Sequence, residues 1–440
     1  MNKTNLLISI LIMALTFAAC VDEPKIPEQE PEPPTPEDTM IMDIPYSGTL
    51  PVLFINTENS CKIDSKDEYV NAEWWLDNMG DKRFESIGSR KRPLRTEIKG
   101  RGNATWTNLE KKSYRLKFGE KHKVLGMPSS RHWVLMANAE YWMGQLNDAL
   151  PFEIGRRMGM AWNPRMQPVE VVLNGDYIGL YFLTEKIRVA KDRVNIVEQN
   201  DFETDPEHIT GGWLLEIDNY IEPDNITFIE GNGMPFWVSL HSPEYLSPQQ
   251  REFITNFLIE ADQAIYCSDK SSTEWEKYID IESLVIFYII QEVVDNPEAF
   301  SGSCYMHKQR GSSTKLIFGP MWDCGSSFTR YNRNYLFNDF IYENMPSYCQ
   351  ARWIKEIAKF YDFQLHVRKH WKRFYQEVYP TMDAYLDEFG ARIDLAGKYD
   401  IIRWPHNGTQ NIAARINHYV KACFRKKVTW LQSQWGEENP

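Results

Sequence analysis

The sequence predicts an α+β fold with a sheet-rich N-terminal half and a helical C-terminal half. Short apolar or alternating segments bounded by turn residues recur through the first half, as expected of strands. Two of them flank Asn174-Gly175-Asp176, and Asn-Gly between apolar runs is a strong hairpin signal. After Phe328 the chain becomes amphipathic and basic. Strands gathered in one half and helices in the other are typical of the α+β class.

The strands are expected where short runs are apolar or alternate with a period of two. The segment 111–118 alternates in this way, and its Lys112, Tyr114 or Arg115 is expected to project into a cleft. The expected strands are 50–57, 95–99, 111–118, 132–137, 169–173, 177–183, 211–218, 304–307 and 315–318. Helical spacing of apolar residues predicts helices at 143–158, 247–264, 273–294, 351–361, 363–379 and about 413–435.

Composition narrows the class of protein. The 440 residues are 42% hydrophobic and 25% charged, which is ordinary for a globular protein. The net charge of −12 argues against a nucleic-acid partner, which would need a basic patch or stripe. The 15 Trp, 22 Tyr and 22 Phe can build a core or line grooves that bind sugars. No two of the seven cysteines have CxxC spacing, which argues against a zinc site.

The N-terminus is expected to be a lipoprotein signal peptide over residues 1–19. Lys3 precedes a short apolar run, and Ala18-Ala19-Cys20 resembles a bacterial lipobox. The alternative is an ordinary signal peptide with an incidental cysteine. A Pro/Glu-rich stretch over 20–43 predicts an extended tether. Residues 44–330 and the helical 331–440 would then form one body, lipid-anchored through Cys20 in a bacterial cell envelope, at the outer membrane or cell surface.

Carboxylates on both sides of the hairpin 304–318 are candidates for chemistry. Asp295 and Glu298 precede this hairpin, and Asp323 follows it in Trp322-Asp323-Cys324-Gly325. Phosphoryl transfer uses one carboxylate near the attacking hydroxyl and one that holds Mg²⁺ against the phosphates. The alternative is that Asp323 caps a turn and Glu298 is a solvated charge at a helix end.

Several motifs, in one order, resemble the bacterial spore-coat protein H (CotH) kinase family over roughly residues 50–328. The resemblance is carried by Gly100-Arg101-Gly102-Asn103-Ala104-Thr105-Trp106, Lys111–Phe118, Leu125–Pro128, Trp133–Leu135, Val169–Gly179, Tyr181–Ile187, Gly211–Asp218 and Gly319–Asp323. It implies an atypical protein-kinase-like fold, with ATP and Mg²⁺ or Mn²⁺ as cofactors. It also implies transfer of the ATP γ-phosphate to Ser or Thr of a protein substrate.

Carried over by motif, the resemblance makes Asp323 the metal ligand and Glu298 the catalytic acid, with Asp295 as a rival. Three positions depart from the family pattern. Glu298 stands where an Asp is usual, Gly325 where many members have another Asp, and Asn147 where an Arg is common. A longer carboxylate, one ligand fewer and one cation fewer would each weaken catalysis.

For the phosphates, the sequence favours Lys112, Arg115 and Lys186, because lysine and arginine clamp phosphoryl groups. Glu185 is expected to be the ion-pair partner of such a lysine. The alternative is that these side chains form weak pairs on the outer faces of strands.

Three classes of function remain open at this point. The first is a metal-dependent CotH-like protein kinase. The second is a catalytically inactive, kinase-like surface lipoprotein that binds a glycan or a protein partner. A hydrolase is the weakest class, because the chain has no Gly-x-Ser-x-Gly and no His-Glu-x-x-His motif, although the carboxylate separation that glycoside hydrolysis needs is not visible in a sequence.

Overall fold

The computed structural model describes residues 46–137, 146–220, 224–329, 337–343, 345, 349–405 and 419–436. Residues Ile44–Pro440 form one compact unit. The predicted lipid anchor at Cys20 and the tether lie outside the described residues. The described part contains no helix of the length and apolarity needed to span a membrane.

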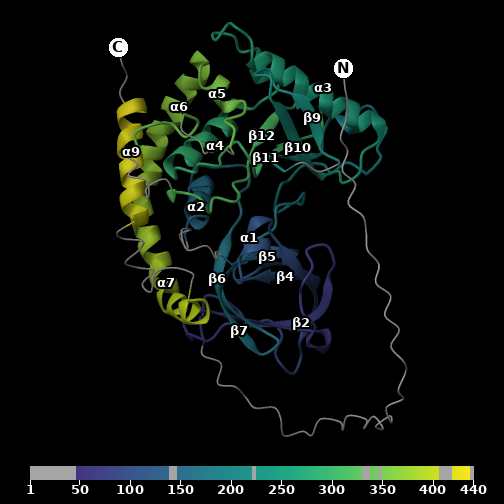
Figure 1. Cartoon of the computed structure of the whole chain (residues 1–440), viewed down its shortest axis with the longest axis vertical. Coiled ribbons are helices and arrows are strands. Elements are labelled where there is room, and N and C mark those ends of the chain that lie inside the picture. The colour runs from purple at the N-terminus through teal and green to yellow at the C-terminus, as the bar shows by residue number, and fades with distance from the viewer. Residues whose placement is uncertain are drawn as a thin grey trace, which may run out of the picture. The chain divides into compact units, whose positions relative to one another are not determined.

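Seven strands of the N-terminal half close into a barrel (Figure 1). In barrel order they are β1 (Val52–Thr57), β2 (Val70–Asp77), β3 (Leu94–Arg101), β4 (Ser113–Val124), β5 (Met127–Met136), β7 (Asp176–Glu185) and β6 (Met166–Leu173). Neighbouring strands are antiparallel, except that β6 returns to pair in parallel with β1. The predicted hairpin is β6–β7, and Asn174 and Gly175 at its turn have φ of 53° and 81°. Positive φ at both central residues is what a tight two-residue hairpin requires.

The barrel keeps aromatic residues inside and cations outside. Trp74 stacks on Phe118 with ring centroids 3.8 Å apart, and Trp133 lies next to Phe118. Along β4 the inward Tyr114, Leu116 and Phe118 are buried, whereas Arg115 alternates with them and is only half-buried. A period of two therefore places the cationic residues of this strand on the outer face.

A second sheet of five strands carries the other half of the body. Its order is β12 (Leu316–Phe318), β11 (Cys304–Lys308), β8 (Trp213–Ile217), β10 (Pro235–Ser242) and β9 (Ile226–Ile229). Helix α3 (Pro248–Ile265) packs beside β9 (Figure 1). The helix begins at Ser247, whose hydroxyl accepts from the Gln250 amide in a capping box.

The remaining helices include a nearly fully buried one. The bounds are α1 (Ala104–Asn108), α2 (Ala149–Arg157), α4 (Ile281–Val293), α5 (Ile354–Ile357), α6 (Tyr361–Arg373), α7 (Met382–Arg403) and α9 (Lys421–Trp435). The apolar run within 284–290 forms the centre of α4, which contacts α2, α6 and α9. Burial on all sides explains why this run shows little amphipathic pattern.

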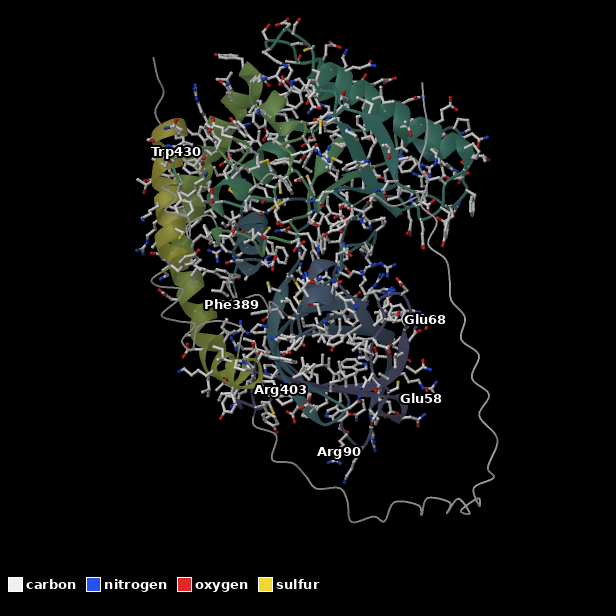
Figure 2. The ribbon with its side chains drawn as sticks, viewed as in Figure 1. Glu58, Glu68, Arg90, Phe389, Arg403 and Trp430 are labelled. Carbon is white, nitrogen blue, oxygen red and sulfur yellow. The ribbon has the colours of Figure 1, made fainter. Side chains whose placement is uncertain are left out.

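Helix α7 joins the C-terminal helices to the barrel. Figure 2 shows Phe389 and Arg403 on this helix, and Phe389 stacks on Phe182 of β7. Arg403 donates through Nε to the Tyr177 carbonyl at 3.1 Å. The buried Lys111 Nζ lies 2.8 Å from Asp400 Oδ1. The helical region after Phe328 is therefore bound to the barrel through both apolar and charged contacts.

The predicted α+β class is confirmed, with strands in the first half and helices in the second. Helix positions differ in detail, because the expected helix 273–294 is a short 3₁₀ turn (Glu274–Lys277) followed by α4 from Ile281. The strand β2 at Val70–Asp77 was not expected, since its acids and aromatics gave no clear pattern. Barrel closure was not predicted either.

Candidate functional site

The loop after β12 exposes Asp323. Its backbone is left-handed, with φ of 53°, a conformation that Asp tolerates better than most residues. The side chain is exposed by its accessible area, yet the protein atoms crowded around its carboxylate raise its pKa. The charge of Arg101 acts in the opposite direction, and Glu216 adds to the rise. Asp323 is thus a solvent-reachable carboxylate in an acidic surrounding.

Two buried polar side chains directly before α2 hold this loop in place. Asn147 Nδ2 donates to the carbonyls of Gly325 at 2.7 Å and Ser327 at 2.8 Å. Asp148 Oδ1 accepts from the Cys324 amide at 2.8 Å. Both side chains are buried, so the loop conformation is specified by contacts distant in sequence. Asn147, one of the departures from the family pattern, has a structural role here.

Asp148 also belongs to the acidic surrounding of Asp323. Burial, followed by the charge of Asp323, raises the pKa of Asp148 to about 7. The Cys324 amide and Arg101 only partly offset this. Asp148 was not predicted as a member of the site, because no local pattern places it beside residue 323.

Glu298 lies near Asp323, between α4 and β11. Both carboxylates act on the same two groups, since each helps to raise the pKa of Tyr220 and of the Cys324 thiol. Glu298 is half-buried, whereas Tyr220 is 49% exposed. The two residues singled out from their spacing along the chain are therefore brought into one neighbourhood.

Strand β8 and the residue that follows it supply two more carboxylates, Glu216 and Asp218. Burial acts to raise the pKa of Glu216, but hydrogen bonds from His241, Tyr305 and Ser303 outweigh it and lower the pKa. Ser303 also hydrogen-bonds to Asp323 and so lies between the two acids. For Asp218, burial and then the charge of Glu216 raise the pKa. The alternating acids in the segment 211–218 are the sequence pattern from which this pair could have been predicted.

Asp295 lies in a different environment from Glu298. It is fully buried, and its Oδ1 lies 3.3 Å from Lys427 Nζ of α9. The same Nζ lies 3.0 Å from Oε2 of the fully buried Glu292. This ion-paired cluster ties α9 to the end of α4. Of the two carboxylates, Glu298 is therefore the more accessible.

Cations gather on the outer face of the barrel. Lys99 of β3 lies directly opposite Arg115 of β4, and both act on Lys186 at the end of β7. Burial, followed by the charges of Arg115, Arg188 and Lys99, lowers the pKa of Lys186 to about 7. The Arg115 Nε is buried without a hydrogen-bond partner among the described residues. Crowded cations of this kind are stabilised by an anion, and phosphate is the ligand that Lys and Arg clamp.

Two other predicted phosphate-site residues have protein partners. Lys112 Nζ donates to the carbonyl of Trp106 and lies over its ring, in the turn around α1. Glu185 was expected to form an ion pair with a phosphate-site lysine. It does not pair with the neighbouring Lys186, because successive residues along a strand point to opposite faces. It pairs with the buried Arg193, with Nη1 2.7 Å from Oε1, and accepts from the Arg165 amide.

Arg101 connects the cationic face with the acidic group. It follows Lys99 by two residues on β3, so the two side chains share one face of the barrel. Its charge acts on both Asp323 and Asp148, and its guanidinium lies 5.5 Å from the Trp322 ring centroid. A cationic face and a set of carboxylates are therefore continuous in this protein, as a site for a polyphosphate and a metal ion requires.

Comparison with protein families assigns the chain. The model for "CotH kinase protein" matches residues 98–432, three quarters of the sequence. The chain belongs to the CotH kinase family. The match extends well beyond Phe328, so the C-terminal helices are part of the family domain. No curated protein matches this CotH family member.

The cysteines of this CotH family member are free thiols in the described part of the chain. These are Cys61, Cys267, Cys304, Cys324, Cys349 and Cys423. Burial raises the pKa of the Cys324 thiol well above its ordinary value, with Asp148 and Asp323 adding to the rise. Although it follows Asp323 directly, Cys324 is thus held as a neutral thiol and is a poor nucleophile.

Proposed function

We propose that this CotH family member is a metal-dependent protein kinase that transfers the γ-phosphate of ATP to Ser or Thr of a protein. The observation that carries the proposal is the continuity, through Arg101, of the cationic barrel face with the carboxylates around Asp323. Phosphoryl transfer is catalysed mainly by positioning and by electrostatic stabilisation, so charged groups of both signs at one site are the main requirement.

The residues fit a Mg²⁺ or Mn²⁺ ion that is shared with a nucleotide. Among the described residues, the carboxylates around Asp323 do not bring three ligand atoms within 4.8 Å of one another. Magnesium is usually held by one or two carboxylates, with phosphate oxygens and water completing its shell. Asp323 would be the main protein ligand, and the ion would neutralise charge on the phosphates. The exposed Asp323 and the repulsion within its acidic surroundings favour such a cation.

The roles of the other groups follow from their placement. Arg115 and Lys186 would clamp the phosphates, and Lys112 remains a predicted contributor from the turn around α1. Glu298 would accept or orient the proton of the attacking hydroxyl, in preference to the ion-paired Asp295. A glutamate is longer than an aspartate by one methylene, so we expect a slower transfer than an aspartate in this position would support.

A phosphotransfer assay tests the proposal. Labelled ATP with Mg²⁺ or Mn²⁺ should label a protein acceptor or the chain itself, and Asp323→Ala should abolish the labelling. Glu274→Gln is the matched control, because it removes an exposed carboxylate paired only with Lys277 and should leave labelling unchanged. Labelling that survives Asp323→Ala would overturn the assignment of Asp323.

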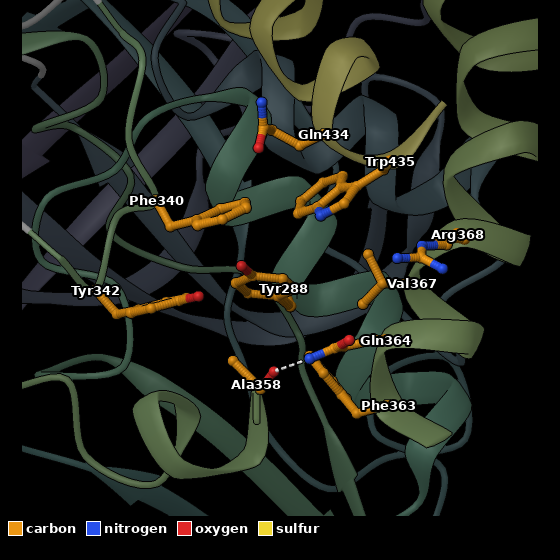
Figure 3. Close-up of a pocket in the computed structure, with 10 residues that line it drawn as sticks. All are labelled: Tyr288, Phe340, Tyr342, Ala358, Phe363, Gln364, Val367, Arg368, Gln434 and Trp435. Carbon is orange, nitrogen blue, oxygen red and sulfur yellow. Dashed lines mark hydrogen bonds between the residues drawn. The ribbon is translucent and has the colours of Figure 1, made fainter. Parts of the chain in front are cut away.

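A second candidate function, a kinase-like module that binds a glycan or protein partner, is favoured by a specific pocket. The pocket has a volume of about 180 Å³ and lies among α4, α6 and α9 (Figure 3). Its lining is Tyr288, Phe340, Tyr342, Ala358, Phe363, Gln364, Val367, Arg368, Gln434 and Trp435. Aromatic faces beside amide and guanidinium groups suit a single sugar ring, and the volume is below the roughly 300–1,000 Å³ of larger ligand sites. Binding of sugars that is lost in Trp435→Ala, with no labelling by ATP, would favour this function.

We also propose a cellular location for this protein. The lipobox-like Ala18-Ala19-Cys20 and the Pro/Glu stretch support a body held at a bacterial cell envelope by lipid on Cys20. Metabolic labelling with a fatty-acid analogue that is lost in Cys20→Ala would support it, and labelling that persists would contradict it.

A further inference from the structure

The first turn of α4 and one face of α6 bring two imidazoles onto one carboxylate. His366 Nδ1 lies 3.1 Å from Glu282 Oε1, and His370 Nε2 contacts Glu282 Oε2. The histidines are one helical turn apart on α6, so their side chains share a face. One ligand atom from each of the three residues lies within 4.8 Å of the others.

We propose that Glu282, His366 and His370 bind a divalent transition-metal ion of the zinc class. Two imidazoles and one carboxylate are a zinc ligand set, with bonds of about 2.0–2.2 Å. Ligand atoms of a tetrahedral site with such bonds lie about 3.4 Å apart. The observed spacing therefore requires only small side-chain movements to close around an ion.

The surroundings supply the other features of a metal site. His366 turns its second nitrogen, Nε2, toward Asp362 Oδ2 at 3.6 Å, and ligating histidines commonly have a carboxylate in that position. His370 is buried, whereas the side chain of Glu282 is 43% exposed, which leaves a side open for water as a fourth ligand. The site lies on α4 and α6, so the ion would cross-link two helices.

Lys369 is the group that competes with the ion. Its Nζ lies 3.0 Å from Glu282 Oε1, but its side chain is 66% exposed and can turn into solvent. A site that serves only as an ion-pair network would keep Lys369 in place and bind no metal. The two arrangements differ in a measurable way, which is the uptake of one ion per chain.

The experiment titrates the metal-free full chain with Zn²⁺, and with Co²⁺ as a spectroscopic probe, in millimolar Mg²⁺. We expect one equivalent of Zn²⁺ to bind and raise the melting temperature, and Co²⁺ to give the intense visible absorption of a four-coordinate site. His366→Ala and Glu282→Gln should each weaken Zn²⁺ affinity more than about tenfold, and Asp362→Asn by about tenfold. His366 is only partly buried, so its variant should fold even where a His370 variant does not.

Two controls separate this site from others. His208→Ala removes a histidine paired with Glu203 at 3.2 Å and should leave zinc affinity unchanged, because that pair lacks a second imidazole. Asp323→Ala should also leave it unchanged, which makes the result independent of the proposed kinase activity. Absence of stoichiometric Zn²⁺ uptake by the unaltered chain, or uptake unaffected by His366→Ala and Glu282→Gln, would overturn the proposal.

Discussion

Two carboxylate clusters, one containing Glu292 and Asp295 and the other containing Glu298, meet in a short stretch of the chain. They differ in which groups neutralise their charge. Glu292 and Asp295 are fully buried and share the ammonium of Lys427. Glu298, three residues later, belongs instead to the group around Asp323, where burial and mutual repulsion raise the pKa of Asp323, Asp148 and Asp218. The comparison teaches that the partner, more than the residue type, separates a structural carboxylate from a candidate functional one. A paired cluster depends on the cation inside the protein, whereas a repelling one is suited to bind a cation from outside.

The largest effect is expected from removing the shared cation of the first cluster. Lys427→Met would remove the ammonium that the buried Glu292 and Asp295 share and should lower the free energy of unfolding by about 3–5 kcal/mol. Denaturant unfolding measures this. Lys277→Met, which removes the cation of an exposed pair with Glu274, is the control and should cost no more than about 1 kcal/mol. Similar small losses in both variants would erase the proposed difference between the clusters.

In the second cluster, we expect Asp323→Asn to lower activity without lowering stability. We expect phosphotransfer to fall by a factor of about 10²–10³, because the variant removes the main metal ligand and a preorganised charge. Stability should stay the same or rise, since the raised pKa of Asp323 means that its charge is unfavourable in the folded protein. Asn also accepts the left-handed backbone at this position. A loss of stability comparable to that of Lys427→Met would show that Asp323 is structural.

A smaller effect is expected at Asn147, a structural residue that holds the loop carrying the proposed metal ligand Asp323. Asn147→Ala removes both hydrogen bonds that hold the carbonyls of Gly325 and Ser327 and should cost about 1–3 kcal/mol. Phosphotransfer should fall as well, because the loop that carries Asp323 is less well defined. The control is Asn71→Ala, whose amide makes one exposed contact with Glu58. Full activity in Asn147→Ala would show that the loop does not depend on this anchor.

The smallest effect is a pH dependence on the cationic side of the site. The pKa of Lys186 is lowered to about 7, and bound phosphate would raise it again. ATP should therefore bind best below pH 7, and its dissociation constant should rise about tenfold between pH 6.5 and 8.5. Lys186→Met should remove this part of the slope, which calorimetry at several pH values can measure.

The same lowered pKa gives a stability prediction with a definite sign. Between about pH 7 and the ordinary pKa of lysine, 10.5, the unfolded chain holds the Lys186 proton more firmly than the folded one. Stability should therefore rise with pH across this window in the unaltered protein, relative to Lys186→Met. Equal pH dependence in both proteins would contradict the crowding of cations around Lys186.

Local patterns predicted part of the local structure, whereas helix α7 and strands β9 and β10 were not expected. The β6–β7 hairpin, the strand that became β4 and the helices α3 and α4 follow from turn residues and periodicity. Closure of the barrel depends on the parallel pairing of β1 with β6, which no local pattern encodes. Lys111 is buried in an ion pair with Asp400, which lies far along the chain, so this pair was equally hidden from the sequence.

The candidate site, like the fold, could be predicted only in part from the sequence. Motif spacing found Asp323 and Glu298, and the structure brings their charges onto a common neighbour, Tyr220. The sequence could not separate Asp295 from Glu298, because the deciding partner, Lys427, comes from α9. Asn147 stands where the family often has an arginine, so the sequence predicted only the loss of a phosphate contact. Its hydrogen bonds to the loop that carries Asp323 are visible only in the structure. The assigned roles in catalysis stay predictions.

The most direct test of the central claim, that Asp323 and the cationic barrel face form one nucleotide–metal site, is a thermal-stability measurement with ATP and Mg²⁺ or Mn²⁺. Ligand binding to the native state raises the melting temperature by mass action. We predict a rise that needs both ATP and the metal and that is lost in Asp323→Asn and in Lys186→Met, but kept in Glu274→Gln. No rise at millimolar nucleotide, or a rise that both site variants retain, would contradict the claim.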